Sequence, residues 1–65
     1  MKLSMDKIKI QMARAKLTIT ELAQRYGVSR NRMNVILNQR EVTPVCAGRI
    51  ADALGVDVTE ILLDE

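Results

Sequence analysis

The sequence has little of several residue types on which common enzyme chemistries depend. Its 65 residues include no histidine, one cysteine, one aromatic residue and one proline. Without histidine, and with Cys46 as the single thiol, Cys–His dyads, Ser-His-Asp triads and cysteine–histidine zinc sites cannot form. We therefore expect a protein that is not an enzyme and that uses no metal and no other cofactor.

Long apolar runs are also missing. No hydrophobic stretch is long enough to span a membrane, and the N-terminal residues lack the apolar core of a secretory signal. We therefore expect a soluble protein of the cytoplasm. Because Tyr26 is the only aromatic residue, unpaired bases have no platform to stack on, which argues against a single-stranded nucleic acid as partner. Hydrophobic residues still make up 48% of the chain, enough for the core of one small domain over residues 1–65.

The charges that are present are distributed unevenly along the chain. Residues 1–40 contain nine basic and two acidic residues, whereas residues 41–65 contain one basic and six acidic residues. This polarity favours one face for a polyanion and another face that is turned away from it. The alternative is a chance asymmetry, since charges on small helical domains are often lopsided.

Hydrophobic spacing and capping residues divide the chain into five short helical segments. Apolar residues recur every three or four positions, and no stretch alternates as a half-buried strand would. Each segment starts at a residue that can cap a helix: Ser4, Thr18, Ser29, Thr43 before Pro44, and Asp57. The sequence thus predicts an all-α fold with helices over about 4–16, 19–26, 29–38, 43–54 and 57–63.

Two of these segments have buried faces that the spacing defines directly. In the first helix, Ile8, Met12 and Ala15 form the expected apolar stripe, with Met5 at its start. In the last segment the expected core contacts are Val58, Ile61 and Leu62.

The second and third segments have the features of a helix-turn-helix motif over about 19–38. Ala23 supplies the small residue needed where two helices cross, and Gly27 supplies the positive φ that the turn requires. Met33 and Ile36 then anchor the second helix inward. This arrangement leaves the N-terminal half of that helix protruding, as a DNA-binding motif requires.

Through Ala23, Gly27 and Val28, with Leu22 beside them, the chain resembles the phage-repressor or Cro-like helix-turn-helix domains, often called the XRE family. The stretch over 49–62 is similar to the end of such domains, so the resemblance covers about residues 5–63. It implies a compact five-helix, lambda-repressor-like domain of a bacterium, phage or mobile element. Such domains are usually dimers that bind operator DNA and control transcription.

The resemblance makes the helix over about 29–38 the recognition helix of the major groove. Arg30 can then form a fork on guanine, Asn31 or Asn34 can pair with adenine, and Val35 can contact a thymine methyl group. The positions that the resemblance assigns to phosphate contacts are Thr18, Ser29, Arg32, Asn38 and Arg40. The alternative is a merely solvated helix face, but asparagine is a poor helix former, and three of them on one exposed helix favour base recognition.

Three further positions qualify this interpretation. Ile19 stands where the family often has a glutamine that touches phosphate, so we expect an apolar contact there, to a neighbouring helix or to sugar. Cys46 is expected to be a small, partly buried residue rather than a redox sensor. Leu63, on the acidic fifth helix, marks the surface on which we expect two copies to dimerise.

The leading functional hypothesis is a sequence-specific, repressor-like regulator that binds a palindromic operator in double-stranded DNA as a homodimer. The alternative is an antitoxin-like or other protein-interaction module for which DNA binding is secondary. A protein-binding helix would more often expose leucine or phenylalanine than the arginines and asparagines found here.

Overall fold

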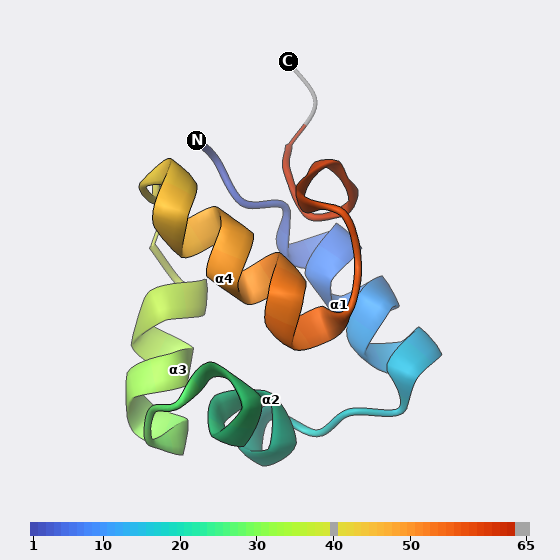
Figure 1. Cartoon of the computed structure of the whole chain (residues 1–65), viewed down its shortest axis with the longest axis vertical. Helices are drawn as coiled ribbons and strands as arrows, with labels where there is room; N and C mark the ends of the chain where they lie inside the picture. Colours follow the sequence, from blue (N-terminus) through green and yellow to red (C-terminus); the bar gives the residue numbers. More distant parts are fainter. Residues whose placement is uncertain (40, 64–65) are drawn as a thin grey trace.

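Four α-helices and one 3-10 helix make up the part of the chain that the computed structural model describes, residues 1–39 and 41–63 (Figure 1). They are α1 (Met5–Ala15), α2 (Ile19–Tyr26), α3 (Arg30–Leu37), α4 (Pro44–Leu54) and the 3-10 helix η1 (Val58–Glu60). The predicted all-α class is confirmed. None of the helices in these residues is long and apolar enough to span a membrane.

The predicted caps are the residues at which the helices begin. Each cap side chain accepts a hydrogen bond from a backbone N–H of the first turn, which satisfies one of the donors that a helix start leaves free. The five caps are Ser4, Thr18, Ser29, Thr43 and Asp57. Local side-chain chemistry therefore sets where each helix starts, before any tertiary contact is considered.

The prediction of a fifth α-helix over 57–63 is wrong. Only Val58–Glu60 are helical, in one 3-10 turn, and Leu62 then forms an isolated bridge with Leu3. The backbone carbonyl of Ile61 accepts a hydrogen bond from the N–H of Ser4 at 2.8 Å, and the N–H of Leu63 donates to the carbonyl of Lys2 at 2.9 Å. These groups are bonded to the N-terminal segment and are not available to continue a helix.

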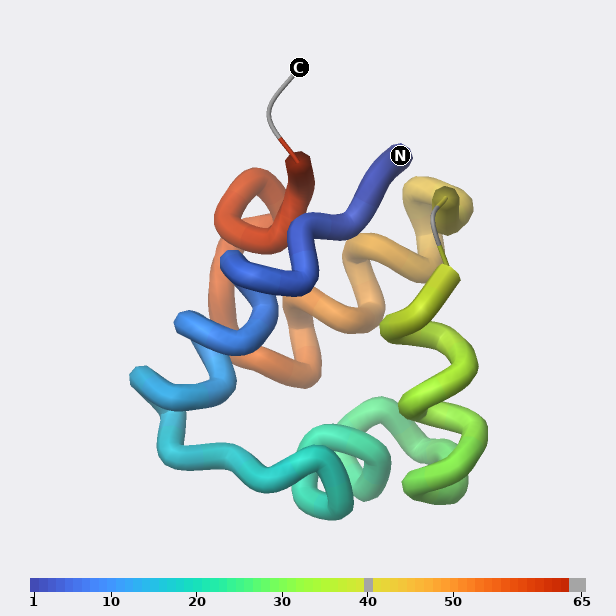
Figure 2. The backbone as a smooth tube through the Cα atoms, turned by 180° about the vertical axis from the view of Figure 1, so that it is seen from behind, coloured from blue at the N-terminus to red at the C-terminus, as the bar shows by residue number. Residues whose placement is uncertain are grey.

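The first residues of the chain lie between two segments that are far away in sequence. Lys2 pairs with Glu41, and Leu3 pairs with Leu62, in isolated antiparallel bridges. Figure 2 shows this N-terminal segment running between the chain that follows η1 and the start of α4. The two ends of the domain are thereby fastened together at the end of the molecule away from α2.

The core is built from one large, fully buried side chain from each part of the fold. These side chains are Ile8, Leu22, Met33, Ile50 and Ile61. Helix α4 packs against α1, α2 and η1, whereas α3 packs mainly against α2. The position of α3 therefore depends on α2 and on the turn between them.

The predicted stripe of α1 is only partly correct. Ile8 is fully buried and Met12 packs against the core, but Met5 and Ala15 are exposed. Gln11 is buried instead, and its Nε2 donates to the Glu60 carboxylate at 3.5 Å. The reason is that α1 packs mainly against α4 and η1, and its buried face includes a polar residue that has a partner on η1.

Candidate nucleic-acid interface

The joint between α2 and α3 is a single tight turn. Gly27 has a φ of 95°, as the sequence predicted, and ends α2 in the left-handed conformation. The carbonyl of Ala23 accepts hydrogen bonds from two N–H groups, that of Gly27 at 2.8 Å and that of Val28 at 3.0 Å. Ala23 itself is buried at the crossing, as expected for a position where a larger side chain would separate the helices.

The outer face of α3 carries the side chains predicted to contact bases. Met33, Ile36 and Leu37 are buried beneath it, and the predicted base-contacting residues are all exposed: Arg30, Asn31, Asn34 and Val35. With 3.6 residues per turn, Asn31 and Val35 lie opposite the buried stripe, while Arg30 and Arg32 lie on its two flanks. The fold therefore brings these side chains together on one accessible helix.

The structure describes four of the five residues predicted to contact phosphates: Ser29, Arg32 and Asn38 belong to α3 or its caps, and Thr18 caps α2. Ser29 Oγ accepts from the N–H of Arg32 at 3.1 Å, and Thr18 Oγ1 accepts from the N–H of Glu21 at 3.2 Å. Both hydroxyl groups keep a proton to donate. Arg32 and Asn38 are exposed, the latter at the C-terminal end of α3. Arg40 lies outside the described residues.

Ile19 packs against the core cluster and is partly buried. Of the two contacts that the sequence left open, to a neighbouring helix or to sugar, the structure supports the first. Ile19 thereby adds apolar packing at the start of α2, which Thr18 caps.

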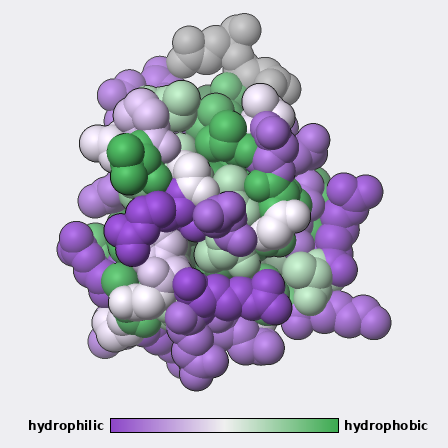
Figure 3. Space-filling view, in the orientation of Figure 1, coloured by the Kyte–Doolittle hydropathy of each residue, from purple (hydrophilic) through white to green (hydrophobic). Residues whose placement is uncertain are grey.

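Charge along this part of the chain has one sign. Residues 22–40 contain four arginines and no acidic residue. Helix N-termini ordinarily favour acidic residues, yet the first turn of α3 has none. Figure 3 shows hydrophilic side chains over the lower end of the molecule, around α2 and the start of α3, and larger apolar areas in the upper half. The α2–α3 end is therefore suited to an anionic partner.

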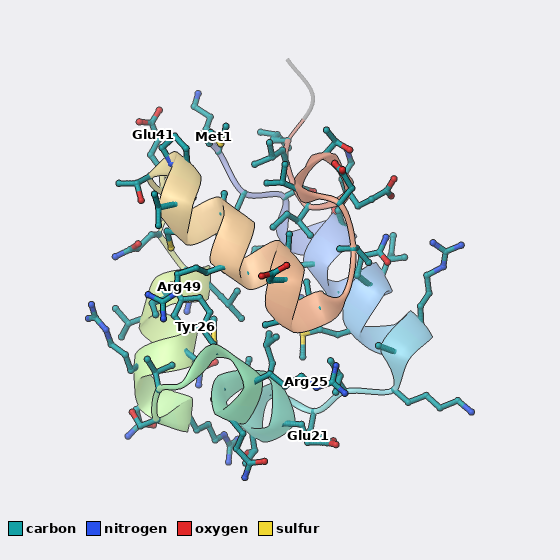
Figure 4. All side chains as sticks on the ribbon, viewed as in Figure 1. Met1, Glu21, Arg25, Tyr26, Glu41 and Arg49 are labelled. Carbon is teal, nitrogen blue, oxygen red and sulfur yellow. The ribbon has the colours of Figure 1, made fainter. Side chains whose placement is uncertain are left out.

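Sequence reasoning missed two arginines that hold α2 to α4. Arg49 Nη2 donates to the carbonyl of Tyr26 at 3.4 Å, and its guanidinium carbon lies 4.5 Å from the centre of the Tyr26 ring (Figure 4). Arg25 Nη1 donates to the carbonyl of Ala53, also at 3.4 Å. A signal for Arg49 was present, since it is the one basic residue in the otherwise acidic stretch 41–65.

The hydroxyl group of Tyr26 makes a further contact with α4. The hydroxyl lies 3.5 Å from Cys46 Sγ, and Cys46 is half-buried as predicted. The hydrogen bond to Cys46 and partial burial raise the pKa of Tyr26 above its ordinary value of 10.0, although the charges of Arg49 and Arg32 act in the opposite direction. Tyr26 is therefore uncharged at neutral pH, and its ring can attract the Arg49 cation.

Comparison with known families gives a match over nearly the whole chain. The model of the Cro/C1-type helix-turn-helix DNA-binding domain matches residues 7–65. The matched region includes α2, α3, α4 and η1 in full, together with α1 from Lys7 onward. No curated protein and no solved structure gives a significant match.

The backbone conformations of Gly27 and Gly48 predict opposite effects on stability when each is replaced by alanine. Gly27→Ala should lower the free energy of unfolding by about 1–2 kcal/mol, because a Cβ strains a positive φ. Gly48→Ala, in the exposed part of α4, should raise it by about 0.5–1 kcal/mol. An added Cβ meets no atom within 4 Å at either site, so the two differ in backbone conformation and not in space. Urea unfolding measures both changes, and a Gly27→Ala protein as stable as the wild type would contradict the assignment.

The capping box of α2 predicts a pH-dependent contribution to stability. The pKa of the Glu21 carboxyl is held below its ordinary value of 4.5. The main cause is the hydrogen bond that the carboxylate accepts from the backbone N–H of Thr18, and the Thr18 side chain adds to it. A carboxyl whose pKa is lowered by folding stabilises the fold above its unfolded pKa, and this stabilisation is lost as pH falls through the folded pKa. Glu21→Gln should therefore unfold more easily than the wild type at neutral pH. The difference should narrow in strong acid, and a difference independent of pH would show that the charge plays no part.

Proposed function

Because the chain belongs to the Cro/C1-type helix-turn-helix DNA-binding domain family, we propose that it is a sequence-specific, repressor-like regulator of transcription. In this proposal α3 enters the major groove of double-stranded DNA. The observation that carries it is the exposed face of α3, where arginine and asparagine side chains stand over a buried apolar stripe. An eight-residue helix of this kind can present several side chains to the edges of a few base pairs.

The chemistry of each exposed side chain fits a particular base. The guanidinium of Arg30 can donate two hydrogen bonds to O6 and N7 of guanine, and the amide of Asn31 or Asn34 can pair with N6 and N7 of adenine. Val35, 52% exposed, offers an apolar surface to the methyl group of thymine. Each paired contact discriminates between bases by about 1–3 kcal/mol.

The residues around α3 are proposed to fix its register on the DNA backbone. Thr18 and Ser29 offer hydroxyl protons at the starts of α2 and α3, and exposed Arg32 and Asn38 flank the reading face. Arg40, which follows α3 in the sequence, joins them in the proposal on its charge alone. Contacts of this kind set orientation and affinity but carry little sequence information.

Two copies are proposed to bind together on a palindromic operator. The domain measures 29 Å along its longest axis, which is less than the spacing of about 34 Å between equivalent half-sites one DNA turn apart. One copy therefore reads one half-site. Leu63 is 51% exposed beyond η1 and remains our proposed contact between copies, although the helix expected to present it is not formed.

Selection of binding sites from a random double-stranded DNA pool tests the proposal. Enrichment of a palindrome would support specific binding by two copies and would give the half-site spacing. Enrichment of a single half-site would support base recognition but contradict cooperative binding by two copies. Only salt-sensitive binding with no preferred sequence would contradict the proposal and favour the protein-interaction alternative.

The two flanks of α3 predict different substitution effects. Arg30→Ala should weaken binding to the selected sequence by about 1–3 kcal/mol, with a much smaller loss on random DNA. Arg32→Ala removes the same charge from the other flank and should weaken both complexes about equally. Fluorescence anisotropy with the selected duplex and a random duplex measures the ratio of the two affinities for each variant. If the Arg30→Ala protein still preferred the same sequence, Arg30 would not take part in base recognition.

A further inference from the structure

Arg49 is held in place by Tyr26 rather than by an acidic residue. Its guanidinium lies over the Tyr26 ring, 4.5 Å from the ring centre, and donates one hydrogen bond to the Tyr26 carbonyl. In the described part of the chain, the contacts of Arg49 include no ion pair with a carboxylate. Two contacts to one residue therefore fix the orientation of the guanidinium without neutralising its charge.

The remaining hydrogen-bonding capacity of Arg49 is large. A guanidinium has five N–H donors in one plane, and the contact to Tyr26 uses one nitrogen. The side chain is exposed, so the other donors are accessible. A planar, pre-oriented group with free donors is well suited to a phosphate oxygen, because little side-chain entropy is lost on binding.

The position of Arg49 places this charge beside the recognition helix. Tyr26 is the last residue of α2, directly before the turn into α3, and Figure 4 shows Tyr26 and Arg49 together next to α3. The charges of both Arg49 and Arg32 act to lower the pKa of the Tyr26 hydroxyl. Arg32 lies on the flank of α3 for which a phosphate contact is proposed.

We propose that Arg49 binds a phosphate of the DNA backbone beside the one bound by Arg32, and that the Tyr26 ring and carbonyl orient its guanidinium. This inference rests on the proposed function and extends it. The DNA interface then continues from the helix-turn-helix onto α4. A phosphate contact there adds affinity that does not depend on the DNA sequence, and it positions the flank of α3 against one DNA strand.

Arg25 provides a matched control within the same fold. It also donates to a backbone carbonyl at 3.4 Å and links α2 to α4, and its loss removes the same charge. Its charge, however, acts on the Glu21 carboxylate, and Figure 4 shows it on the side of α2 away from Arg49. Arg25 therefore separates the effect of a lost phosphate contact from that of a lost charge or a lost interhelical bond.

The salt dependence of binding to a short random-sequence duplex tests the proposal. The logarithm of the binding constant falls linearly with the logarithm of the salt concentration, and each lost phosphate contact makes this slope less steep by about 0.9. Arg49→Gln should show this decrease, and Arg49→Lys, which keeps the charge, should restore most of the slope. Arg25→Gln should keep the wild-type slope. Circular dichroism establishes that each variant is folded, and a folded Arg49→Gln protein with the wild-type slope would overturn the proposal.

A measurement on the wild-type protein keeps the proposal testable if a variant does not fold. Tyr26 is the only tyrosine, so its ring signals in NMR spectra report on this contact alone. Addition of the random duplex should shift the Tyr26 ring and Arg49 Hε signals and leave Arg25 Hε nearly unchanged. Equal or absent shifts at Arg49 and Arg25, with the duplex bound, would contradict the proposal. Failure of the wild type to bind any duplex would instead contradict the proposed function.

Discussion

The carbonyl of Ala23 is the point on which the arrangement of α3 depends. It accepts hydrogen bonds from the N–H groups of both Gly27 and Val28, which end α2 and set the direction in which the chain continues to α3. This geometry requires a residue that tolerates positive φ and a small residue at the crossing, and Gly27 and Ala23 provide them. Because α3 packs mainly against α2, a change in the geometry of this turn would displace the whole exposed face of α3. The contact of Arg49 with Tyr26 holds the same joint from α4.

Stability and the proposed function place opposite demands on α3. Its asparagines are poor helix formers, and its first turn lacks the acidic residues that would stabilise it. A helix of eight residues is also too short to persist alone. Burial of Met33, Ile36 and Leu37, with the Ser29 cap, compensates for these costs. The inner face of α3 thus supplies the stability, and its outer face carries the exposed arginine and asparagine side chains that are proposed to bind DNA.

Most of the fold could be predicted from the sequence because it depends on local chemistry. The features that depend on long-range contacts could not be predicted. The caps at Ser4, Thr18, Ser29, Thr43 and Asp57 act within one turn, so their residue types sufficed. The segment after η1 reads as a helix locally, but its backbone bonds to Lys2 and Ser4 at the other end of the chain. Buried Gln11 donates to Glu60, 49 positions later, and Arg49 donates to Tyr26, 23 positions earlier. The face of α3 could be predicted because helical spacing fixes it, whereas the bases or phosphates that each side chain meets depend on the DNA.

The central claim, that α3 lies in the major groove, is tested most directly by methylation protection on a selected DNA site. Dimethyl sulfate modifies guanine N7 in the major groove and adenine N3 in the minor groove. With α3 in the major groove, the complex should show strong protection of guanine N7 at the half-sites. Arg30→Ala should lose that protection, whereas Arg32→Ala should keep it at saturating protein. Protection confined to adenine N3, or full occupancy without protection of guanine N7, would contradict this placement of α3.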